Sequence, residues 1–152
     1  MLQIGTKAPE IVLQDKNGSL VRLSDLAGQK VVLYFYSKDN TSGCTKQALA
    51  FAAAYEQIKA LGAEVVGVSK DTAASHLKFA EKNALPFILL ADPEHQSLEA
   101  YEVWQEKMQC GKKVWGTVRA TYVISEDGTI EYVWPKVKPE ANAQDVIDYL
   151  SK

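Results

Sequence analysis

The sequence predicts an α/β fold in three layers, with helices packed on both faces of a central mixed β-sheet. Three short apolar runs, residues 30–36, 64–69 and 86–90, are rich in β-branched and aromatic side chains, as expected for strands buried on both faces. Segments with helical spacing separate these runs, and the pattern then changes to a β-hairpin over 120–134 before a last helix. No repeat or linker interrupts the 152 residues, so we expect one domain spanning 1–152.

The N-terminal part of the chain is typical of a β-hairpin. Two strand-like runs, 11–13 and 19–23, flank a turn that contains Asn17-Gly18, and an Asn-Gly pair favours a tight hairpin turn. The buried run 30–36 follows after a short loop. The predicted fold therefore starts with an N-terminal β-hairpin.

Helices are expected between and after the buried strands. Apolar residues at helical spacing follow the polar segment 37–43, and Gly62 supplies a C-terminal cap for this first helix. A short helix is expected over 97–101, and a closing helix over 142–150. These helices would cover the faces of the sheet.

Residues 71–83 predict a further helix, capped by Asp71. Its inner face is expected to include Ala73, Leu77 and Ala80. His76 would then lie on the solvated side of this helix, and His95 in a surface loop. Neither histidine pairs with a cysteine at the spacing of metal ligands, so we expect no metal site.

The C-terminal third begins with the polar segment 107–113, which contains Gly111 and is predicted to be a loop. Beyond it, 120–124 and 129–134 flank Glu126-Asp127-Gly128, which indicates an antiparallel hairpin with a glycine turn. The central sheet is therefore expected to be mixed rather than wholly parallel.

The composition excludes several classes of protein. Seventeen Lys and Arg against nineteen Asp and Glu give a net charge of −2, which argues against a nucleic-acid binder. No apolar run approaches the ~20 residues that span a bilayer, and residues 1–6 lack a secretory signal. Two cysteines, Cys44 and Cys110, make no disulfide framework and fit a reducing, cytoplasmic location. Neither a Gly-x-Gly-x-x-Gly nor a Walker-type motif is present, so no cofactor is expected.

Cys44 is the first candidate for chemistry. It lies in the first turn of a predicted helix, just after the buried strand 30–36 and the polar segment 37–43. Unpaired backbone N–H groups and the helix dipole stabilise a thiolate there, which lowers the pKa of the thiol. Ligand crevices in open α/β sheets also form at strand ends. The alternative interpretation is a small buried hydrophobic residue, as free cysteines often are.

Six segments, taken in order, carry a family resemblance over nearly the whole chain. They are Gly5-Thr6-Lys7-Ala8-Pro9, Leu23-Ser24-Asp25-Leu26-Ala27-Gly28, Val32-Leu33-Tyr34-Phe35-Tyr36, Thr41-Ser42-Gly43-Cys44-Thr45, Val66-Gly67-Val68-Ser69-Lys70-Asp71 and Gly116-Thr117-Val118-Arg119-Ala120-Thr121-Tyr122-Val123-Ile124. In this order and spacing the chain resembles a peroxiredoxin of the Q type, also called bacterioferritin comigratory protein. The resemblance implies a thioredoxin-like fold and the thiol-dependent reduction of hydrogen peroxide and organic hydroperoxides.

The resemblance also implies three catalytic residues. Cys44 matches the peroxidatic cysteine of the family, Thr41 its active-site threonine and Arg119 its active-site arginine. Attack on a peroxide needs a thiolate, and a permanently charged guanidinium stabilises both that thiolate and the leaving oxygen. Arg119 is one of only two arginines in the chain, the other being Arg22.

Substrate binding is expected around the same residues. Backbone N–H groups at Gly43 and Cys44 can hold an oxygen, and the Thr41 hydroxyl can both accept and donate. Tyr36 and Phe35 are candidates for an apolar wall that excludes water and admits organic hydroperoxides.

Two positions near Cys44 depart from the family pattern. Ser37 and Ser42 stand where the family usually has proline. Proline fixes φ and removes a donor, so the two serines predict a more flexible loop. Because the thiol, the hydroxyl and the arginine remain, we expect an active enzyme; a catalytically weak or silent binding or holdase protein is the alternative.

The sequence identifies the thiol that reduces the oxidised Cys44 less clearly. Many Q-type members have a resolving cysteine five residues after the peroxidatic one, and Leu49 occupies that position here. A sulfenic acid must meet another thiol, and Cys110 is the only internal candidate. A bridge needs Cα atoms within about 7 Å. We favour a one-cysteine cycle, with thioredoxin, glutaredoxin or a low-molecular-weight thiol as reductant. A monomer is expected, with a dimer as the alternative.

A dithiol oxidoreductase is disfavoured because Gln47 stands where a C-x-x-C motif needs cysteine.

Overall fold

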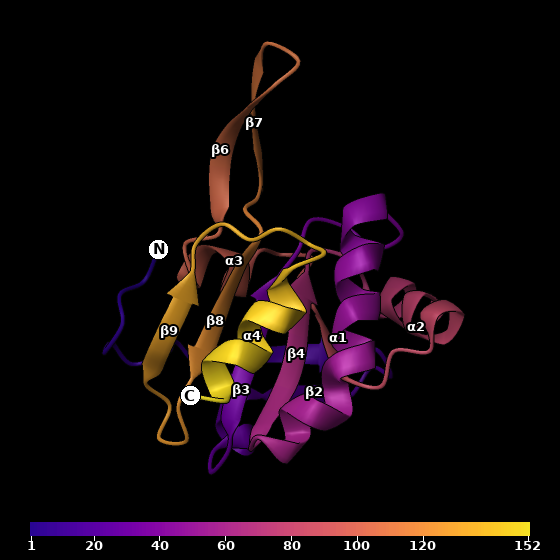
Figure 1. The fold of residues 1–152 in the computed structure, drawn as a ribbon. Helices are drawn as coiled ribbons and strands as arrows, with labels where there is room; N and C mark the ends of the chain where they lie inside the picture. The colour runs from indigo at the N-terminus through magenta and orange to yellow at the C-terminus, as the bar shows by residue number, and fades with distance from the viewer.

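The computed structural model describes residues 1–152 and contains one seven-stranded mixed sheet and a separate two-stranded hairpin (Figure 1). The elements, in chain order, are β1 (Val12–Asp15), β2 (Leu20–Arg22), the 3-10 helix η1 (Leu23–Leu26), β3 (Lys30–Phe35), α1 (Ser42–Ala60), β4 (Ala63–Ser69), α2 (Ala73–Asn83), β5 (Ile88–Ala91), α3 (Gln96–Ala100), β6 (Trp104–Gln109), β7 (Lys112–Thr117), β8 (Ala120–Ile124), β9 (Ile130–Trp134) and α4 (Asn142–Leu150). The strand order is β2-β1-β5-β4-β3-β8-β9. Strands β3, β4 and β5 are parallel, and every other pairing is antiparallel. The predicted mixed sheet and N-terminal hairpin are confirmed.

Strand β3 is buried on both faces, as its apolar sequence predicts. Val32 and Tyr34 belong to a core shared with α1, α2 and α4, whereas Leu33 and Phe35 belong to a second core with α3 and the N-terminal segment. This alternation follows from the pleat of the strand, which directs successive side chains to opposite faces. Helices α1 and α4 lie in front of the sheet and α3 behind it (Figure 1), which gives the three predicted layers. No helix combines the length and apolar character needed to cross a bilayer.

The register between β3 and β8 places residues that are far apart in the sequence at one end of the sheet. Phe35 is paired with Ala120, so Arg119 lies just beyond the last residue of β3. The chain leaves β3 at the same end and enters α1 at Ser42. Antiparallel pairing therefore brings Arg119 beside the loop that leads into α1.

Helix α2 differs from the prediction in its cap and in its inner face. Thr72, not Asp71, is the cap, and its hydroxyl accepts a hydrogen bond from the Ser75 backbone N–H at 3.2 Å. His76 is 0% exposed and Leu77 is 36% exposed, so the predictions of a solvated His76 and an inward Leu77 were wrong. The imidazole can be buried because polar partners inside the fold satisfy both ring nitrogens.

Residues 107–113, predicted to be a loop, form the outer part of a hairpin that projects from the body of the molecule (Figure 1). Strands β6 and β7 pair up to Gln109 and Lys112, which leaves Cys110 and Gly111 as a two-residue turn. Both turn residues have positive φ, 52° and 78°, as a type I′ turn requires. The hairpin signal was missed because cysteine replaces the asparagine or aspartate usual before glycine in such turns.

Candidate active site

Cys44 is the third residue of helix α1, at the carboxyl end of β3. The helix begins at Ser42 after the N-cap residue Thr41, whose side chain makes no cap hydrogen bond. The first backbone N–H groups of a helix have no partner within it, so they and the positive end of the helix dipole lie next to Cys44. Cys44 is only 1% exposed. The predicted position of the thiol in the first turn of a helix is confirmed.

Arg119 binds the sulfur directly. Its Nη2 donates a hydrogen bond to Cys44 Sγ at 3.3 Å, and its Nη1 donates to Gln47 Oε1 at 2.6 Å. No carboxylate forms an ion pair with the guanidinium. The full positive charge of Arg119 is therefore available to the sulfur and to an oxygen bound beside it.

A buried polar network holds the guanidinium in place. Gln47 Nε2 donates to Asn142 Oδ1 at 3.0 Å, and the Thr121 hydroxyl donates to the same oxygen at 2.8 Å. All three residues are 0% exposed. Arg119 is thus connected through Gln47 to α4 and β8, which restricts its rotamer. This role of Gln47 was not predicted from the sequence, although its position three residues after Cys44 places it on the same face of the helix.

The pKa of the Cys44 thiol lies below its ordinary value. Burial by itself raises this pKa, but hydrogen bonds from the Lys38 backbone N–H and the Thr41 hydroxyl, together with the charge and hydrogen bond of Arg119, lower it by more. The environment therefore favours the thiolate, which is the nucleophilic form of cysteine.

Thr41 and the two aromatic candidates occupy different surroundings. Thr41 is exposed, and its hydroxyl donates to the Lys38 carbonyl at 2.8 Å. The hydroxyl has one proton, so it can serve either this carbonyl or the sulfur at any moment. Tyr36 is 1% exposed and packs in the same core as Cys44, but its hydroxyl donates to Asp39 at 2.6 Å. Phe35 points to the opposite face of the sheet, so the prediction that it walls the Cys44 pocket was wrong.

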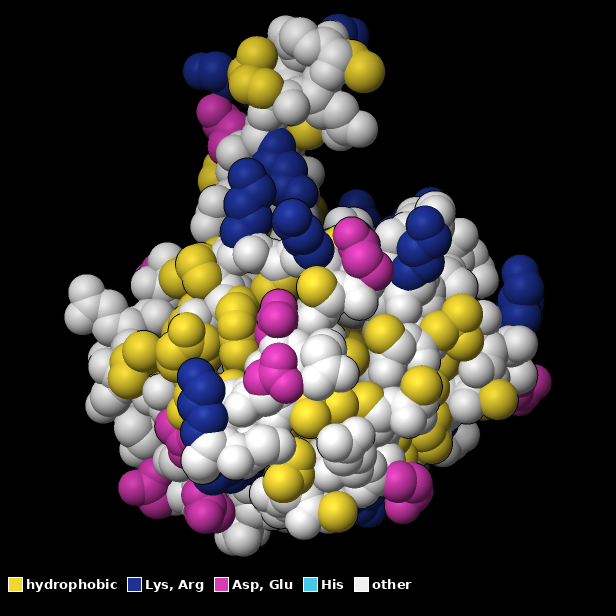
Figure 2. All heavy atoms as spheres, in the orientation of Figure 1, with side chains coloured by type: hydrophobic (Ala, Val, Ile, Leu, Met, Phe, Trp, Pro, Cys, Tyr) yellow, Lys and Arg dark blue, Asp and Glu magenta, His cyan; other side chains and the backbone are white.

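The surroundings of Arg119 are positively charged. A cavity of about 620 Å³ borders Arg119 and includes Lys107 and Lys136, but no acidic residue, in its lining. Burial lowers the pKa of Lys107, and the charges of Arg119 and Lys70 lower it further. In Figure 2, Lys and Arg side chains gather at the base of the projecting hairpin. This end of the molecule therefore favours an anionic sulfur or oxygen.

Gly43 leaves room for the guanidinium. A Cβ at this position would lie 3.3 Å from Arg119 Nη2 and 3.3 Å from Pro139 Cγ, closer than ordinary van der Waals contact. We expect Gly43→Ala to displace the guanidinium and to slow the reaction of Cys44 with peroxide by about 10-fold, since small misplacements of catalytic groups are costly. Thermal unfolding should separate the two effects, because alanine is about 1 kcal/mol better than glycine inside a helix. A slower reaction without loss of stability is the expected result, and an unchanged reaction rate would contradict it.

Cys110 lies far from this site. It is exposed at the tip of the β6–β7 hairpin, and β7 alone extends roughly 17 Å from its first to its last residue at the usual rise per residue of a strand. A hairpin of this length holds its tip away from the body of the molecule (Figure 1), whereas a disulfide needs Cα atoms within about 7 Å. In this conformation the hairpin keeps Cys110 from bridging to Cys44.

The site combines an activated thiol at a helix N-terminus with a guanidinium that has no carboxylate partner, and both lie at one end of a mixed α/β sheet. This combination is that of a thiol-dependent oxidoreductase. A family model described as the AhpC/TSA family matches residues 4–133. This chain belongs to the AhpC/TSA family, and within it to the peroxiredoxins of the Q, or bacterioferritin comigratory protein, type.

Relatives with names and solved structures agree over almost the whole chain. Peroxiredoxin Bcp of Bacillus subtilis is 42% identical over 149 residues, which cover 98% of this chain and 95% of that protein. Peroxiredoxin Bcp of Escherichia coli is 38% identical over 151 residues, which cover 99% and 97%. The bacterioferritin comigratory protein of Xanthomonas campestris matches with a TM-score of 0.89 at 35% identity, covering 93% of this chain and 90% of that one. A mutant of PrxQ from Xylella fastidiosa matches with a TM-score of 0.94 at 32% identity, covering 99% and 96%. The thioredoxin-like fold implied by the sequence is confirmed.

Proposed function

We propose that this protein is a thiol-dependent peroxidase that reduces hydrogen peroxide and organic hydroperoxides at Cys44. The contact of 3.3 Å between Arg119 Nη2 and Cys44 Sγ carries the proposal, because it joins a nucleophile to a charge that can stabilise the leaving oxygen. The Xanthomonas campestris relative is described in terms of alkyl peroxide reduction. The whole chain, residues 1–152, would act as one peroxidase domain.

The chemical step needs only these groups and a peroxide. The Cys44 thiolate attacks one peroxide oxygen, an S–O bond forms and the O–O bond breaks, so that the sulfur is oxidised to a sulfenic acid. The second oxygen leaves with the electron pair and takes a proton to give water or an alcohol. Arg119 stabilises the charge that collects on this oxygen, the backbone N–H groups of Gly43 and Cys44 hold the peroxide, and the Thr41 hydroxyl hydrogen-bonds to it.

Turnover in this proposal uses an external thiol. Leu49 and the distant Cys110 offer no internal partner, so a thiol of thioredoxin, glutaredoxin or a small molecule attacks the sulfenic sulfur and releases water. A second external thiol then displaces Cys44 from the mixed disulfide and restores the thiolate. The cycle needs only one copy of the chain, so we propose a monomer, working in the reducing cytoplasm.

Oxidation with one equivalent of hydroperoxide tests both parts of this cycle. We expect non-reducing mass spectrometry to show one added oxygen on Cys44, which a sulfenic-acid trap captures, and no link between the two cysteines. A disulfide between Cys44 and Cys110 would overturn the external reductant. Failure of Cys44 to gain oxygen while peroxide is consumed would overturn the assignment of the nucleophile.

Two competing functions are not favoured. A silent binding or holdase protein would not need an unpaired guanidinium bonded to a buried thiol, and the relatives are named peroxiredoxins. A dithiol exchange enzyme needs a second thiol beside the first. The position in question, Gln47, instead accepts a hydrogen bond from Arg119.

A further inference from the structure

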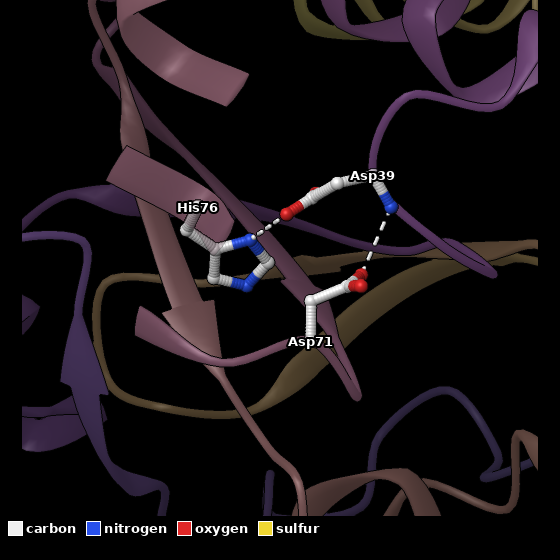
Figure 3. A group of neighbouring side chains, drawn as sticks. All are labelled: Asp39, Asp71 and His76. Carbon is white, nitrogen blue, oxygen red and sulfur yellow. Dashed lines mark hydrogen bonds and ion pairs between the residues drawn. The ribbon is translucent and has the colours of Figure 1, made fainter. Parts of the chain in front are cut away.

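We propose that Asp39 and His76 are positioning residues for the peroxidatic thiol: they anchor the loop of residues 36–41 to helix α2 (Figure 3) and so hold Lys38 and Thr41 beside the first turn of α1, where Cys44 lies. The proposal rests on the proposed function, because it concerns the thiol to which that function assigns the chemistry. Asp39 and His76 do not contact the sulfur or a substrate, so they act through the loop.

The carboxylate of Asp39 is the centre of a buried cluster. Its Oδ1 accepts from the Tyr36 hydroxyl at 2.6 Å, and its Oδ2 accepts from His76 Nδ1 at 2.7 Å and from the Ser75 hydroxyl at 2.8 Å. The backbone N–H of Asp39 donates to Asp71 Oδ2 at 2.9 Å. Asp39 is 4% exposed and His76 is 0% exposed. One loop residue is thus held by four others, through both its side chain and its backbone.

His76 connects this cluster to the sheet. Its Nε2 lies 2.9 Å from the Leu90 carbonyl in β5, while its Nδ1 faces the Asp39 carboxylate. Both neighbours are acceptors, so the imidazole bridges the Asp39 carboxylate and the Leu90 carbonyl. Figure 3 shows the Asp39 side chain directed at His76 and its backbone nitrogen at Asp71. The loop is therefore fixed to α2 and, through His76, to β5.

The charge on Asp39 is maintained in spite of its burial. Burial raises the pKa of this carboxyl, but hydrogen bonds from His76, Tyr36 and Ser75 and the charge of His76 lower it by more. The carboxylate is therefore ionised at neutral pH, as a multiply hydrogen-bonded anchor requires. The other titratable groups near it are Tyr36, just after β3, Tyr34, within β3, and Asp71, from the segment before α2.

The loop needs such an anchor because its own sequence does not restrain it. Residues 36–41 contain no proline, and Ser37 and Ser42 occupy positions where proline would fix φ. Tertiary hydrogen bonds must therefore supply the restriction that proline would have supplied through the backbone.

The anchored residue is next to Lys38, which lies close to the start of α1. Asp39 follows Lys38, whose carbonyl accepts from the Thr41 hydroxyl at 2.8 Å, immediately before the first turn of α1. A backbone hydrogen bond from Lys38 is among the influences that lower the pKa of Cys44. If Asp39 is released, Lys38 can move away and the thiolate loses a donor. Arg119 still donates to the sulfur, so the reaction of Cys44 with peroxide should become slower rather than stop.

Replacement of each histidine by glutamine provides a matched test. His76→Gln removes the imidazole that binds the Asp39 carboxylate, whereas His95→Gln changes a residue that stacks on Trp104 at 3.8 Å, outside the cluster. We expect His76→Gln to raise the pKa of Cys44, measured by thiolate absorbance and by alkylation rate, and to slow peroxide reduction at neutral pH by about 10-fold, the effect of one pKa unit. At a pH above the raised pKa, the rate should return toward that of the wild type. His95→Gln should leave both the pKa of Cys44 and the pH dependence of the peroxide reduction rate unchanged.

A second, milder variant allows the test to be made even if His76→Gln does not fold. Ser75→Ala removes one donor to Asp39 and leaves His76 in place, so it should shift the pKa of Cys44 in the same direction by a smaller amount. If folded His76→Gln and Ser75→Ala proteins both keep the wild-type pH profile, the cluster is only structural and the proposal is wrong. The alkylation readout needs no peroxide, so a wild-type protein that fails to consume peroxide would contradict the proposed function without deciding this inference.

Discussion

Cys44→Ser is expected to lose peroxide reduction almost completely, by roughly 1,000-fold or more, because a serine hydroxyl does not ionise at neutral pH and cannot act as the nucleophile. Stopped-flow measurement of hydroperoxide consumption, with a small dithiol as reductant, gives the rate. Serine has nearly the size of cysteine and Cys44 is buried against apolar residues, so the fold should be retained. Circular dichroism and the thermal unfolding transition verify that point.

Cys110→Ser is the matched control for this experiment. Cys110 is exposed at the tip of the β6–β7 hairpin, so its replacement should leave peroxide consumption unchanged. If the serine variant of Cys44 kept the parental rate, the assignment of this thiol would be wrong. A loss of turnover in the Cys110 variant, with the first oxidation still fast, would instead return Cys110 to the cycle as a resolving residue.

Arg119→Met is expected to slow the reaction of Cys44 with hydroperoxide by about 100- to 1,000-fold, the usual cost of removing a donor that stabilises charge in the transition state. Arg119→Lys should lose about 10-fold or more, because lysine retains the charge but cannot donate to Cys44 Sγ and Gln47 Oε1 from one planar group. The second-order rate constant for oxidation measures both effects. Arg22→Met, at an exposed arginine in β2, should have no effect and serves as the control.

The pH dependence gives the Arg119 experiment a second readout. In the wild type, burial raises the pKa of Cys44 while Lys38, Thr41 and Arg119 lower it by more, so the thiolate is present at lower pH than for an ordinary cysteine. Loss of Arg119 removes a lowering contribution, so the pKa rises and the rising limb of the rate profile moves to higher pH. In Arg119→Met, raising the pH should recover ionisation but not the full rate, because transition-state stabilisation is still missing. Full recovery at high pH would show that Arg119 acts on thiol ionisation alone.

The regular parts of the fold could be predicted from the sequence because they depend on local patterns. The run at 30–36 forms a strand with alternating faces, and Asn17-Gly18 lies in the turn of the N-terminal hairpin. In contrast, the outer part of the β6–β7 hairpin, residues 107–113, was predicted to be a loop because its residues are mostly polar and the turn signal at Cys110-Gly111 is unusual. A projecting hairpin has no core face, so the alternation that marks other strands is absent.

Some residues of the active site could be predicted from the sequence, and others could not. Cys44 and Arg119 were identified by residue type and family resemblance, and the structure places their side chains in contact. Gln47 had only its helical spacing from Cys44 as a sequence signal, and the buried His76 had none. Their roles depend on partners that are far away in the chain, such as Asn142 for Gln47 and Asp39 for His76.

The sequence by itself therefore determined the order of the strands of the central sheet and of the α-helices, and the helix position of the thiol, since hydrophobic period and turn residues act over a few neighbours. Only the tertiary structure decided which charges meet the sulfur and which polar groups are buried. Hydrogen bonds depend on distances of about 3 Å, and those distances are set by strand register and helix packing rather than by local pattern. The pairing of Phe35 with Ala120 is the clearest case, because it brings Arg119 to a thiol 75 positions away.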